Sequence, residues 1–532
     1  MSTLSQAFTY ARFLRGFPRY LRSALTLEEA RAALQERLER RAEHLVDMAE
    51  RVFFGLASSP YLPLLEQAGC SFADFRASVA DLGVEPTLHR LREAGVYFTF
   101  EEYKGRVPVV RGGREIPVSE GRFDNPFLTH FFRTSTGGST GRPTRTSADL
   151  VHMEVQSQYR MLLLETHGLL DVPFSVWRPA LPSGSGLNNI LRQARMGRPV
   201  DRWFTPLVPG DYAPELKYKL ATEGAVLAGR ACGVSFVRPE PVPLDGAVSI
   251  ARYLADTVRT QGGACLSTTV SCGLRVALAA RSARVDLSGA CLLVAGEPPT
   301  EAKVRGMEAS GASVLSDYGA AETGRIALGC AHPDHFTDMH LTTDTVAVVP
   351  FPRLVPDSGE TVAALNITSL VPTMPKLFLN QELDDFAEME ERECGCPLGE
   401  LGLHTHIRRV RSFRKLVSEG VTLIGSDMVR ILEEVLPSRF GGSPLDYQLV
   451  EDEDERGFTR LSLHVHPQVH LEREQDVVEV MLGALGRTSV AADMARAYWA
   501  AARSFRIVRE APQVSTRGKQ ASLRVVRDTG AA

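Results

Sequence analysis

The spacing of apolar residues predicts a helical beginning to the chain. Residues 27–54 place apolar side chains at steps of three and four among many Arg and Glu residues, a pattern typical of an amphipathic helix that packs on a core. The sequence Ser-Pro-Tyr-Leu-Pro at 59–63 ends this pattern, and a second helical region is expected over 72–94. Strand-like runs follow at 96–100, 107–110 and 116–118. We assign no chemistry to this part and expect it to help build a substrate domain.

The middle of the chain alternates between buried strands and helices. Residues 289–297 form a continuous apolar run bounded by glycine, which is typical of a strand buried on both faces of a parallel sheet. We expect further strands at 174–177, 264–269 and 312–319, and helices at 150–166, 215–230, 244–261 and 301–310. Such alternation predicts an α/β fold, in which ligands bind beyond the carboxyl ends of the strands. We interpret 182–189 as a loop that either lines a ligand pocket or lies on the surface.

Composition and charge narrow the class of protein. A chain of 532 residues is too long for one ordinary core, so about two to four domains or subdomains are expected. Hydrophobic residues make up 44% and charged residues 23%, as in a soluble globular protein. The net charge of −4 gives no reason to expect a nucleic acid or a membrane as partner, and no apolar segment approaches the roughly 20 residues of a membrane span. Because the first residues lack a signal-peptide pattern, we expect a cytoplasmic protein.

A stretch rich in glycine and hydroxyl residues, at 134–145, is the first candidate site. It reads Thr-Ser-Thr-Gly-Gly-Ser-Thr-Gly-Arg-Pro-Thr-Arg. Glycine lets the backbone approach a ligand closely, and successive exposed N–H groups form a concave anion site. The stretch lacks the lysine of the usual Gly-x-x-x-x-Gly-Lys-Ser/Thr loop, and a flexible surface loop is the alternative. We interpret it as a polyphosphate loop whose binding residues are Thr136, Gly137, Gly138, Ser139, Thr140 and Gly141.

The order of these residues carries a resemblance to a known family. Residues 136–144 resemble the phosphate loop of the adenylate-forming superfamily, typically Ser-Ser-Gly-Thr-Thr-Gly-Lys-Pro-Thr, and most closely that of its phenylacetate–CoA ligase-like branch. The departures are Gly137 for serine, Ser139 for threonine and Arg142 for lysine.

A second motif follows in the order that this resemblance requires. Residues 296–298 read Gly-Glu-Pro and 317–322 read Asp-Tyr-Gly-Ala-Ala-Glu, where the family has a Gly-Glu-Pro-like strand end and then Tyr-Gly-x-Thr-Glu. The resemblance implies that Glu322 holds Mg²⁺ against the phosphates of ATP and that Tyr318 stacks near the adenine. The nucleotide-binding residues it implies here are Gly296, Glu297, Asp317, Tyr318 and Gly319. From the residue alone, the simpler interpretation of Glu322 is a carboxylate at a helix N-terminus, which needs no function.

Three further positions match the family less closely. Asp385 aligns with the aspartate that binds the ribose, although a slip of one residue selects Asp384 and an acidic turn is the alternative. Arg411 matches the arginine of the linker near the ribose and phosphate, while Phe413 stands in place of the hinge aspartate. The resemblance implies that Lys519 pairs with the substrate carboxylate and the α-phosphate; taken alone, it is a solvated lysine in a basic tail.

Cysteine usage suggests a metal site. The eight cysteines are sparse for this length and do not form a disulfide framework. Zinc favours four Cys and His ligands in a tetrahedral array, and the two clusters that offer them are Cys330 with His332, and Cys394 with Cys396. We predict a structural Zn²⁺ site there; unligated cytosolic thiols are the alternative.

The resemblance implies a fold and a reaction. The expected fold class is α/β, with a large N-terminal domain of several subdomains and mixed or parallel sheets, plus a small α+β C-terminal lid domain, divided as 1–120, 121–411 and 412–532. The expected enzyme is an ATP- and Mg²⁺-dependent ligase that activates a carboxylic acid as acyl-AMP and transfers it, most simply to CoA. Alternative acceptors are an amine, a hydroxyl or a carrier-protein thiol, and a non-catalytic nucleotide-binding homologue is a further alternative. A homodimer is a family-level expectation. We name Trp177, Asn188 and Trp203 as pocket or core candidates.

Overall fold

The computed structural model describes most of the chain. The described residues are 3–135, 145–206, 216–354, 361–412, 417–418, 421–422, 425–453, 459–485, 505–514, 518, 520 and 522–525. Three predicted positions therefore lie outside the described residues: the phosphate loop at 136–144, Phe413 and Lys519.

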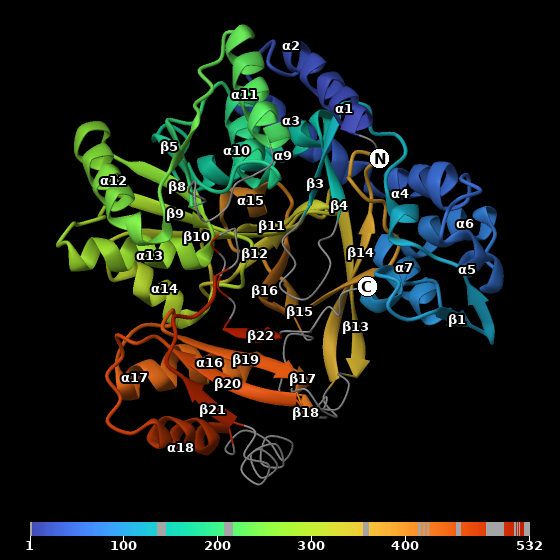
Figure 1. Ribbon diagram of the computed structural model, residues 1–532. Coiled ribbons are helices and arrows are strands. Elements are labelled where there is room, and N and C mark those ends of the chain that lie inside the picture. Colours follow the sequence, from blue (N-terminus) through green and yellow to red (C-terminus); the bar gives the residue numbers. More distant parts are fainter. Residues whose placement is uncertain are drawn as a thin grey trace.

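A mixed sheet of twelve strands forms the centre of the molecule (Figure 1). One half is parallel, in the order β7-β6-β5-β8-β9-β10, and the other half is antiparallel, in the order β11-β12-β16-β15-β14-β13. The parallel strands are β5 (Phe174–Trp177), β6 (Arg202–Thr205), β7 (Pro239–Pro241), β8 (Ala264–Thr268), β9 (Ala290–Val294) and β10 (Ser313–Ala320). The antiparallel strands are β11 (Gly324–Gly329), β12 (Met339–Leu341), β13 (Val346–Leu354), β14 (Thr361–Ser369), β15 (Gln381–Glu391) and β16 (Thr405–Ser412).

Helices cover both faces of the parallel half, as the apolar run at 289–297 predicts. Successive side chains of β9 alternate between two cores: Cys291 and Leu293 pack with α9 and α10, whereas Leu292 and Val294 pack with α12 to α14. Asp149 starts α9, because its Oδ1 accepts a hydrogen bond from the Val151 amide at 2.8 Å. The helices are α9 (Leu150–Thr166), α10 (Gly184–Arg195), α11 (Leu216–Ala231), α12 (Ala247–Gln261), α13 (Val270–Ser282), α14 (Glu301–Glu308) and α15 (Pro397–Glu400).

The N-terminal region is helical, as its periodicity predicts. Its helices are α1 (Thr3–Arg15), α2 (Phe17–Tyr20), α3 (Leu27–Glu39), α4 (Arg41–Met48), α5 (Leu62–Gln67), α6 (Phe72–Leu82), α7 (Val84–Glu93) and α8 (Phe100–Tyr103), and a hairpin joins β1 (Val109–Arg111) to β2 (Arg114–Ile116). Many of them share a core with β13 to β16. The strand expected at 96–100 is wrong: Phe98 alone makes a bridge, to Gln381, and Thr99 then caps α8 through a capping box with Glu102.

The C-terminal part has a sheet and a core of its own, drawn below the large sheet in Figure 1. Four strands pair in the order β21 (Phe505–Val508), β20 (Thr459–Val465), β19 (Tyr447–Glu453) and β22 (Leu523–Val525). Three helices, α16 (Gly425–Arg430), α17 (Leu436–Phe440) and α18 (Glu474–Leu485), accompany this sheet, and two short strands, β17 (Val417–Ser418) and β18 (Val421–Thr422), pair separately. The predicted fold class, a large α/β part with a smaller α+β part, is confirmed. Within the described residues, no helix is both long and apolar enough for a membrane span.

Candidate functional site

A short hairpin leads into and out of the predicted phosphate loop. Strand β3 (Phe131–Ser135) pairs with β4 (Arg145–Asp149), and Ser135 lies opposite Arg145 where the described hairpin ends. The hydroxyl of Thr146 donates a hydrogen bond to the carbonyl of Ala321 at 2.9 Å. The base of the hairpin is therefore fixed to the turn that carries Glu322, so the two sequence motifs meet in the fold.

One cavity collects the residues predicted for the nucleotide. It has a volume of about 850 Å³ and lies beyond the carboxyl ends of β9 and β10, between the large sheet and the C-terminal part. This is the edge at which parallel sheets bind ligands. The predicted residues that line it are Gly296, Glu297, Asp317, Tyr318, Gly319, Asp385 and Arg411.

Tyr318 and Asp385 face each other in this cavity. The phenol of Tyr318 donates a hydrogen bond to Oδ2 of Asp385 at 2.7 Å. Burial, and then the charge of Asp385, raise the pKa of Tyr318 well above its ordinary value, so the phenol keeps its proton. The predicted alternative of an acidic turn is wrong, because both aspartates belong to β15. Asp384 has a φ of +74° at a break in the strand register and accepts a hydrogen bond from Ser412, whereas Asp385 lines the cavity.

Glu297, which follows β9, lines one side of the cavity and lies against the start of α13. Both the amide and the hydroxyl of Ser271 donate to its carboxylate. The described neighbours of Lys519 contact the same helix: the Cys272 thiol donates to the Gly518 carbonyl at 3.5 Å, and the Gln520 amide donates to Ser271 Oγ at 3.4 Å. The residues on both sides of Lys519 therefore lie against the end of α13 that holds Glu297.

Glu322 lies in the turn between β10 and β11. No helix of the described chain begins there, so the interpretation as a helix N-terminal carboxylate is wrong. The residue is buried, with 8% of its surface exposed, and its Oε1 lies 3.9 Å from Nζ of Lys104. The hairpin that carries the predicted phosphate loop is bonded to this turn through Thr146, and a single carboxylate in such a position fits the way Mg²⁺ is held in phosphate sites, by one or two carboxylates together with the phosphates.

A second, smaller cavity adjoins the first. It has a volume of about 280 Å³, lies among α9, α10 and the carboxyl ends of β5, β8, β9 and β10, and shares Gly296, Asp317 and Gly319 with the first cavity. Asn188 lines it, whereas Trp177 and Trp203 are core residues that are 1% and 0% exposed.

Sequence reasoning missed most of the residues of this second cavity. The loop expected at 182–189 is mostly helix, since α10 begins at Gly184 with Ser183 as its N-cap. Gly186 is required where α10 packs on the sheet, because a Cβ there would lie 2.5 Å from the Trp203 ring. Gly186 therefore serves close packing, while Ser183, Ser185 and Asn188 line the second cavity, which confirms the expectation that 182–189 borders a pocket.

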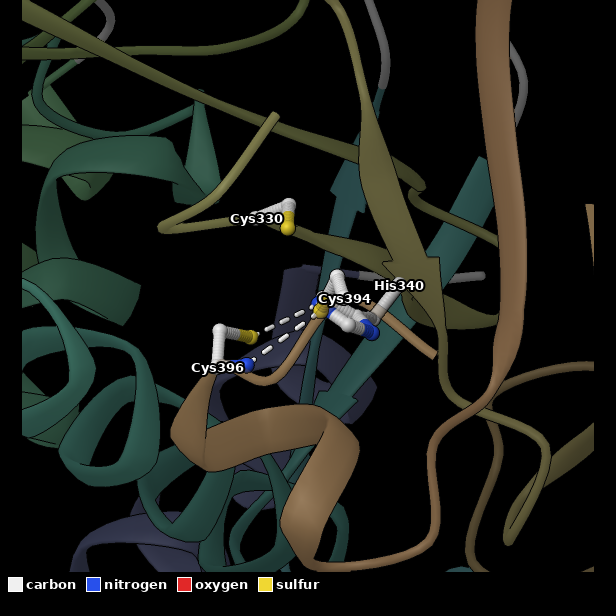
Figure 2. Close-up of side chains that lie close together, drawn as sticks. All are labelled: Cys330, His340, Cys394 and Cys396. Atoms are coloured by element: carbon white, nitrogen blue, oxygen red, sulfur yellow. Dashed lines mark hydrogen bonds between the residues drawn. The ribbon is translucent and has the colours of Figure 1, made fainter. Parts of the chain in front are cut away.

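A cluster of cysteine and histidine side chains lies apart from both cavities. Figure 2 shows that four side chains converge, and their ligand atoms all lie within 4.8 Å of one another: Cys330, His340, Cys394 and Cys396. Nδ1 of His340 lies 2.6 Å from the carbonyl of Leu403. Since a carbonyl only accepts, Nδ1 carries the proton, and Nε2 presents its lone pair at 3.0 Å from the Cys396 sulfur. This donor set fits a tetrahedral metal ion.

The structure corrects the histidine of the predicted metal site. His332 is not a member of the cluster: its ring Nδ1 faces the Cys394 carbonyl at 3.0 Å. His340 takes its place. A second possible set, Cys330 with Asp338 and His406, is already engaged, because Arg392 forms an ion pair with Asp338 and His406 lies 2.8 Å from it.

The chain was compared with known proteins. No protein-family model and no curated protein sequence matches it. Among solved structures, it is similar to 2-hydroxyisobutyryl-CoA ligase in complex with 2-HIB-AMP and CoA, with 15% identity over 96% of this chain and 91% of that chain and a TM-score of 0.46. It is similar to an anthranilate CoA ligase in complex with anthranoyl-AMP, with 12% identity over 84% and 83% and a TM-score of 0.44. It is also similar to O-succinylbenzoate coenzyme A synthetase from Bacillus subtilis with ATP and magnesium, with 12% identity over 82% and 80% and a TM-score of 0.43.

Proposed function

We propose that the protein is an adenylate-forming ligase that activates a carboxylic acid with ATP. The observation that carries this proposal is the convergence of Glu297, Tyr318, Asp385 and Arg411 on one cavity, although they are spread over more than a hundred residues of chain. That cavity meets a second one at Asp317 and Gly319, so a nucleotide and a small acid have adjoining sites.

The first cavity offers a group for each part of the nucleotide. The Tyr318 ring borders the adenine, and the Asp385 carboxylate accepts hydrogen bonds from the ribose hydroxyls. Such hydrogen bonds are strong because the acceptor is charged. Arg411 supplies a positive charge near the ribose and phosphate. We assign phosphate binding to the residues 136–144 from their sequence, and Glu322 would hold Mg²⁺, which neutralises phosphate charge when bound.

The reaction has two steps. A carboxylate oxygen of the acid attacks the α-phosphorus of ATP, the bond from that phosphorus to the pyrophosphate oxygen breaks, and acyl-AMP and pyrophosphate form. Lys519 stabilises the negative charge that develops between the carboxylate and the α-phosphate. A nucleophile then attacks the acyl carbon and AMP leaves with the former carboxylate oxygen. Catalysis in both steps consists mainly of positioning and charge neutralisation.

The acceptor and the subfamily extend this proposal. CoA thiol is the acceptor that we propose first, with a phenylacetate–CoA ligase-like subtype, and a carrier-protein thiol, amine or hydroxyl is the alternative because Phe413 replaces the hinge aspartate. We keep the division into 1–120, 121–411 and 412–532, with the last part as a lid. A buried ion pair between Lys303 and Glu433, at 2.9 Å, joins α14 to this part in the conformation described.

We further propose that Cys330, His340, Cys394 and Cys396 hold a structural Zn²⁺ ion. Four protein ligands complete the tetrahedral shell that structural sites have, and no position is left for a substrate. Gly395 has a φ of +66°, a conformation that other residues rarely adopt, and this turn brings the two neighbouring thiols to one side. The site would fasten the segment around α15 to β11 and β12.

Hydroxylamine trapping tests the proposed activity. The protein is incubated with MgATP, hydroxylamine and a panel of aromatic, fatty, amino and dicarboxylic acids, and pyrophosphate and hydroxamate are measured. We expect pyrophosphate release that depends on one class of acid and is matched by hydroxamate. ATP binding without release for any acid would contradict the catalytic proposal and favour a nucleotide-binding homologue.

A further inference from the structure

We propose that the 280 Å³ cavity binds an acid that carries a second anionic group, either a further carboxylate or a phosphate. This inference rests on the proposed function for the identity of the site, because it takes the cavity to hold the acid that ATP activates. It adds the chemical class of that acid, which follows from the charges that line the cavity.

Four guanidinium groups line this cavity and only one carboxylate faces them. The arginines are Arg160 on α9, Arg178 after β5, Arg192 on α10 and Arg325 on β11. Asp317 is the carboxylate, and it forms an ion pair with Arg325 at 2.8 Å. Among the described residues, the other three arginines have no carboxylate within ion-pair distance. Within the described part of the chain, this cavity thus carries about three positive charges without a carboxylate partner, whereas buried charges in proteins are normally paired.

Two of these arginines, Arg160 and Arg178, have buried donors without a hydrogen-bond partner in the described structure. Arg178 donates to the carbonyls of Ala295 and Thr268 and leaves only its Nε unpaired. Arg160 is 3% exposed and gives one N–H to Asn189 at 3.2 Å, while its Nε and Nη1 are buried and have no partner within the described structure. Arg192 donates its Nε to the carbonyl of Asn188 at 3.1 Å. A buried donor without a partner costs free energy, which a bound anion removes. The unpaired charge of Arg160 therefore favours an anionic ligand in the cavity that it lines.

Burial and mutual repulsion act on the same groups. Burial, and then the charges of Arg325 and Arg160, lower the pKa of Arg192 well below its ordinary value, and burial lowers the pKa of Arg160 to about 10. The attraction of an anion between α9 and α10 would raise the pKa values of Arg160 and Arg192 again. The rest of the lining mixes polar residues, among them His152 and Gln156, with apolar ones such as Met153 and Leu293.

The carboxylate that reacts cannot by itself account for this charge. It must reach the α-phosphate, which we place where the two cavities meet, at Gly296, Asp317 and Gly319. The arginines of α9 and α10 line the second cavity, and these two helices contribute no residue to the lining of the first. A second anionic group on the same small acid would occupy the arginine side while the first carboxylate faces ATP. A cavity of 280 Å³ suits a compact di- or tricarboxylate or a short phosphorylated acid.

Calorimetric titration of the full chain without ATP tests this inference. The probes are succinate, glutarate, citrate and 3-phosphoglycerate, each beside an analogue in which the second anionic group is an amide or is absent. We expect at least one probe to bind at least 10-fold more tightly than its analogue, and the dicarboxylate and phosphate arms tell the two sources of charge apart. Equal binding of each pair, or no binding by any charged probe, would overturn the inference.

Substitutions of two cavity arginines test whether these residues bind the second anionic group or only support the fold. Arg160→Gln and Arg192→Gln should weaken binding of the preferred probe at least 10-fold and binding of its uncharged analogue less than 3-fold. The control is Arg195→Gln, on the same helix but outside the cavity and paired with Glu154, which should change neither. The inference would be contradicted if the cavity variants lost affinity for the charged probe and for its uncharged analogue to the same extent.

Pyrophosphate release separates this inference from the proposed activity. A charged probe that binds through Arg160 and Arg192 but releases no pyrophosphate with MgATP supports the charge inference and contradicts adenylation of that acid. Pyrophosphate release with monocarboxylic acids alone supports adenylation and overturns the charge inference.

Discussion

The phenol of Tyr318 donates a 2.7 Å hydrogen bond to Asp385, across 67 residues of the chain. Strands β10 and β15 lie in the two halves of the large sheet, so this contact joins the parallel half, which carries the motif of Glu322, to the antiparallel half. In the proposed site Tyr318 borders the adenine and Asp385 binds the ribose. The bond then fixes the carboxylate in the direction from which a ribose would approach, before any nucleotide binds.

Substitution of Asp385 tests the ribose assignment. Asp385→Asn keeps the shape and removes the charge, and because hydrogen bonds to charged groups contribute about 1.5–3 kcal/mol, we expect ATP to bind about 10- to 100-fold more weakly. Asp384→Asn is the matched control, since Asp384 does not line the cavity, and it should change affinity less than 3-fold. Calorimetry measures both. A larger effect at Asp384 would move the assignment by one residue.

Metal analysis tests the corrected ligand set. Protein purified without a chelator should contain about one zinc ion per chain. His340→Ala should lose it and lower the melting temperature by at least about 5 °C, because structural zinc contributes directly to folding free energy. His332→Ala should retain the zinc, as its ring is outside the cluster. Zinc retained in His340→Ala but lost from His332→Ala would restore the ligand set read from the sequence.

Lys519→Ala tests the adenylation step without depending on the fold of the large domain. Loss of one key electrostatic contact to a developing charge costs about 100- to 1,000-fold in rate, so we expect pyrophosphate release to fall at least about 100-fold. The affinity for ATP should stay within about 3-fold of the original. Lys219→Ala, at an exposed position of α11, is the control and should release pyrophosphate at the normal rate. A normal rate for Lys519→Ala would remove the assignment.

Buried His152 predicts a pH dependence of stability. Burial lowers its pKa to about 3, whereas in the unfolded chain it protonates near its ordinary value of 6.5. The unfolded state therefore binds the extra proton first, and the stability that depends on neutral His152 is present above pH 6.5 and is lost as the pH falls towards 3. We measure the free energy of unfolding by urea denaturation at pH 7.5 and at pH 5.5. The decrease between these two pH values should be about 1 kcal/mol smaller for His152→Gln than for the protein with His152. Equal losses would mean that folding does not lower the pKa of His152.

The sequence predicted the parts of the fold that depend on local pattern. The apolar run of β9 and the helix α9 are set by neighbouring residues, and both strand and helix appear where they were expected. The strand expected at 96–100 failed because Thr99 and Glu102 form a capping box, a local signal that competes with the apolar pattern.

The candidate site was predictable where a motif fixes its residues and not where packing does. His340 reaches the cysteines because β11 and β12 pair with Leu328 opposite His340, a register that ligand spacing alone does not give. Arg160 and Arg192 look like ordinary surface residues of amphipathic helices, and their burial follows from the packing of α9 against α10 over the sheet. The position of Lys519 rests on sequence alone, since it lies outside the described residues.

Oxygen transfer tests the central claim, an acyl-AMP intermediate, most directly. The acid that the trapping panel selects is labelled with ¹⁸O in its carboxylate. It is incubated with the protein, MgATP and either CoA or hydroxylamine, and the masses of the products are measured by mass spectrometry. The account predicts AMP that carries one ¹⁸O atom, because AMP leaves with the oxygen that attacked the α-phosphorus. Unlabelled AMP, or ¹⁸O found in inorganic phosphate with ADP as product, would contradict it.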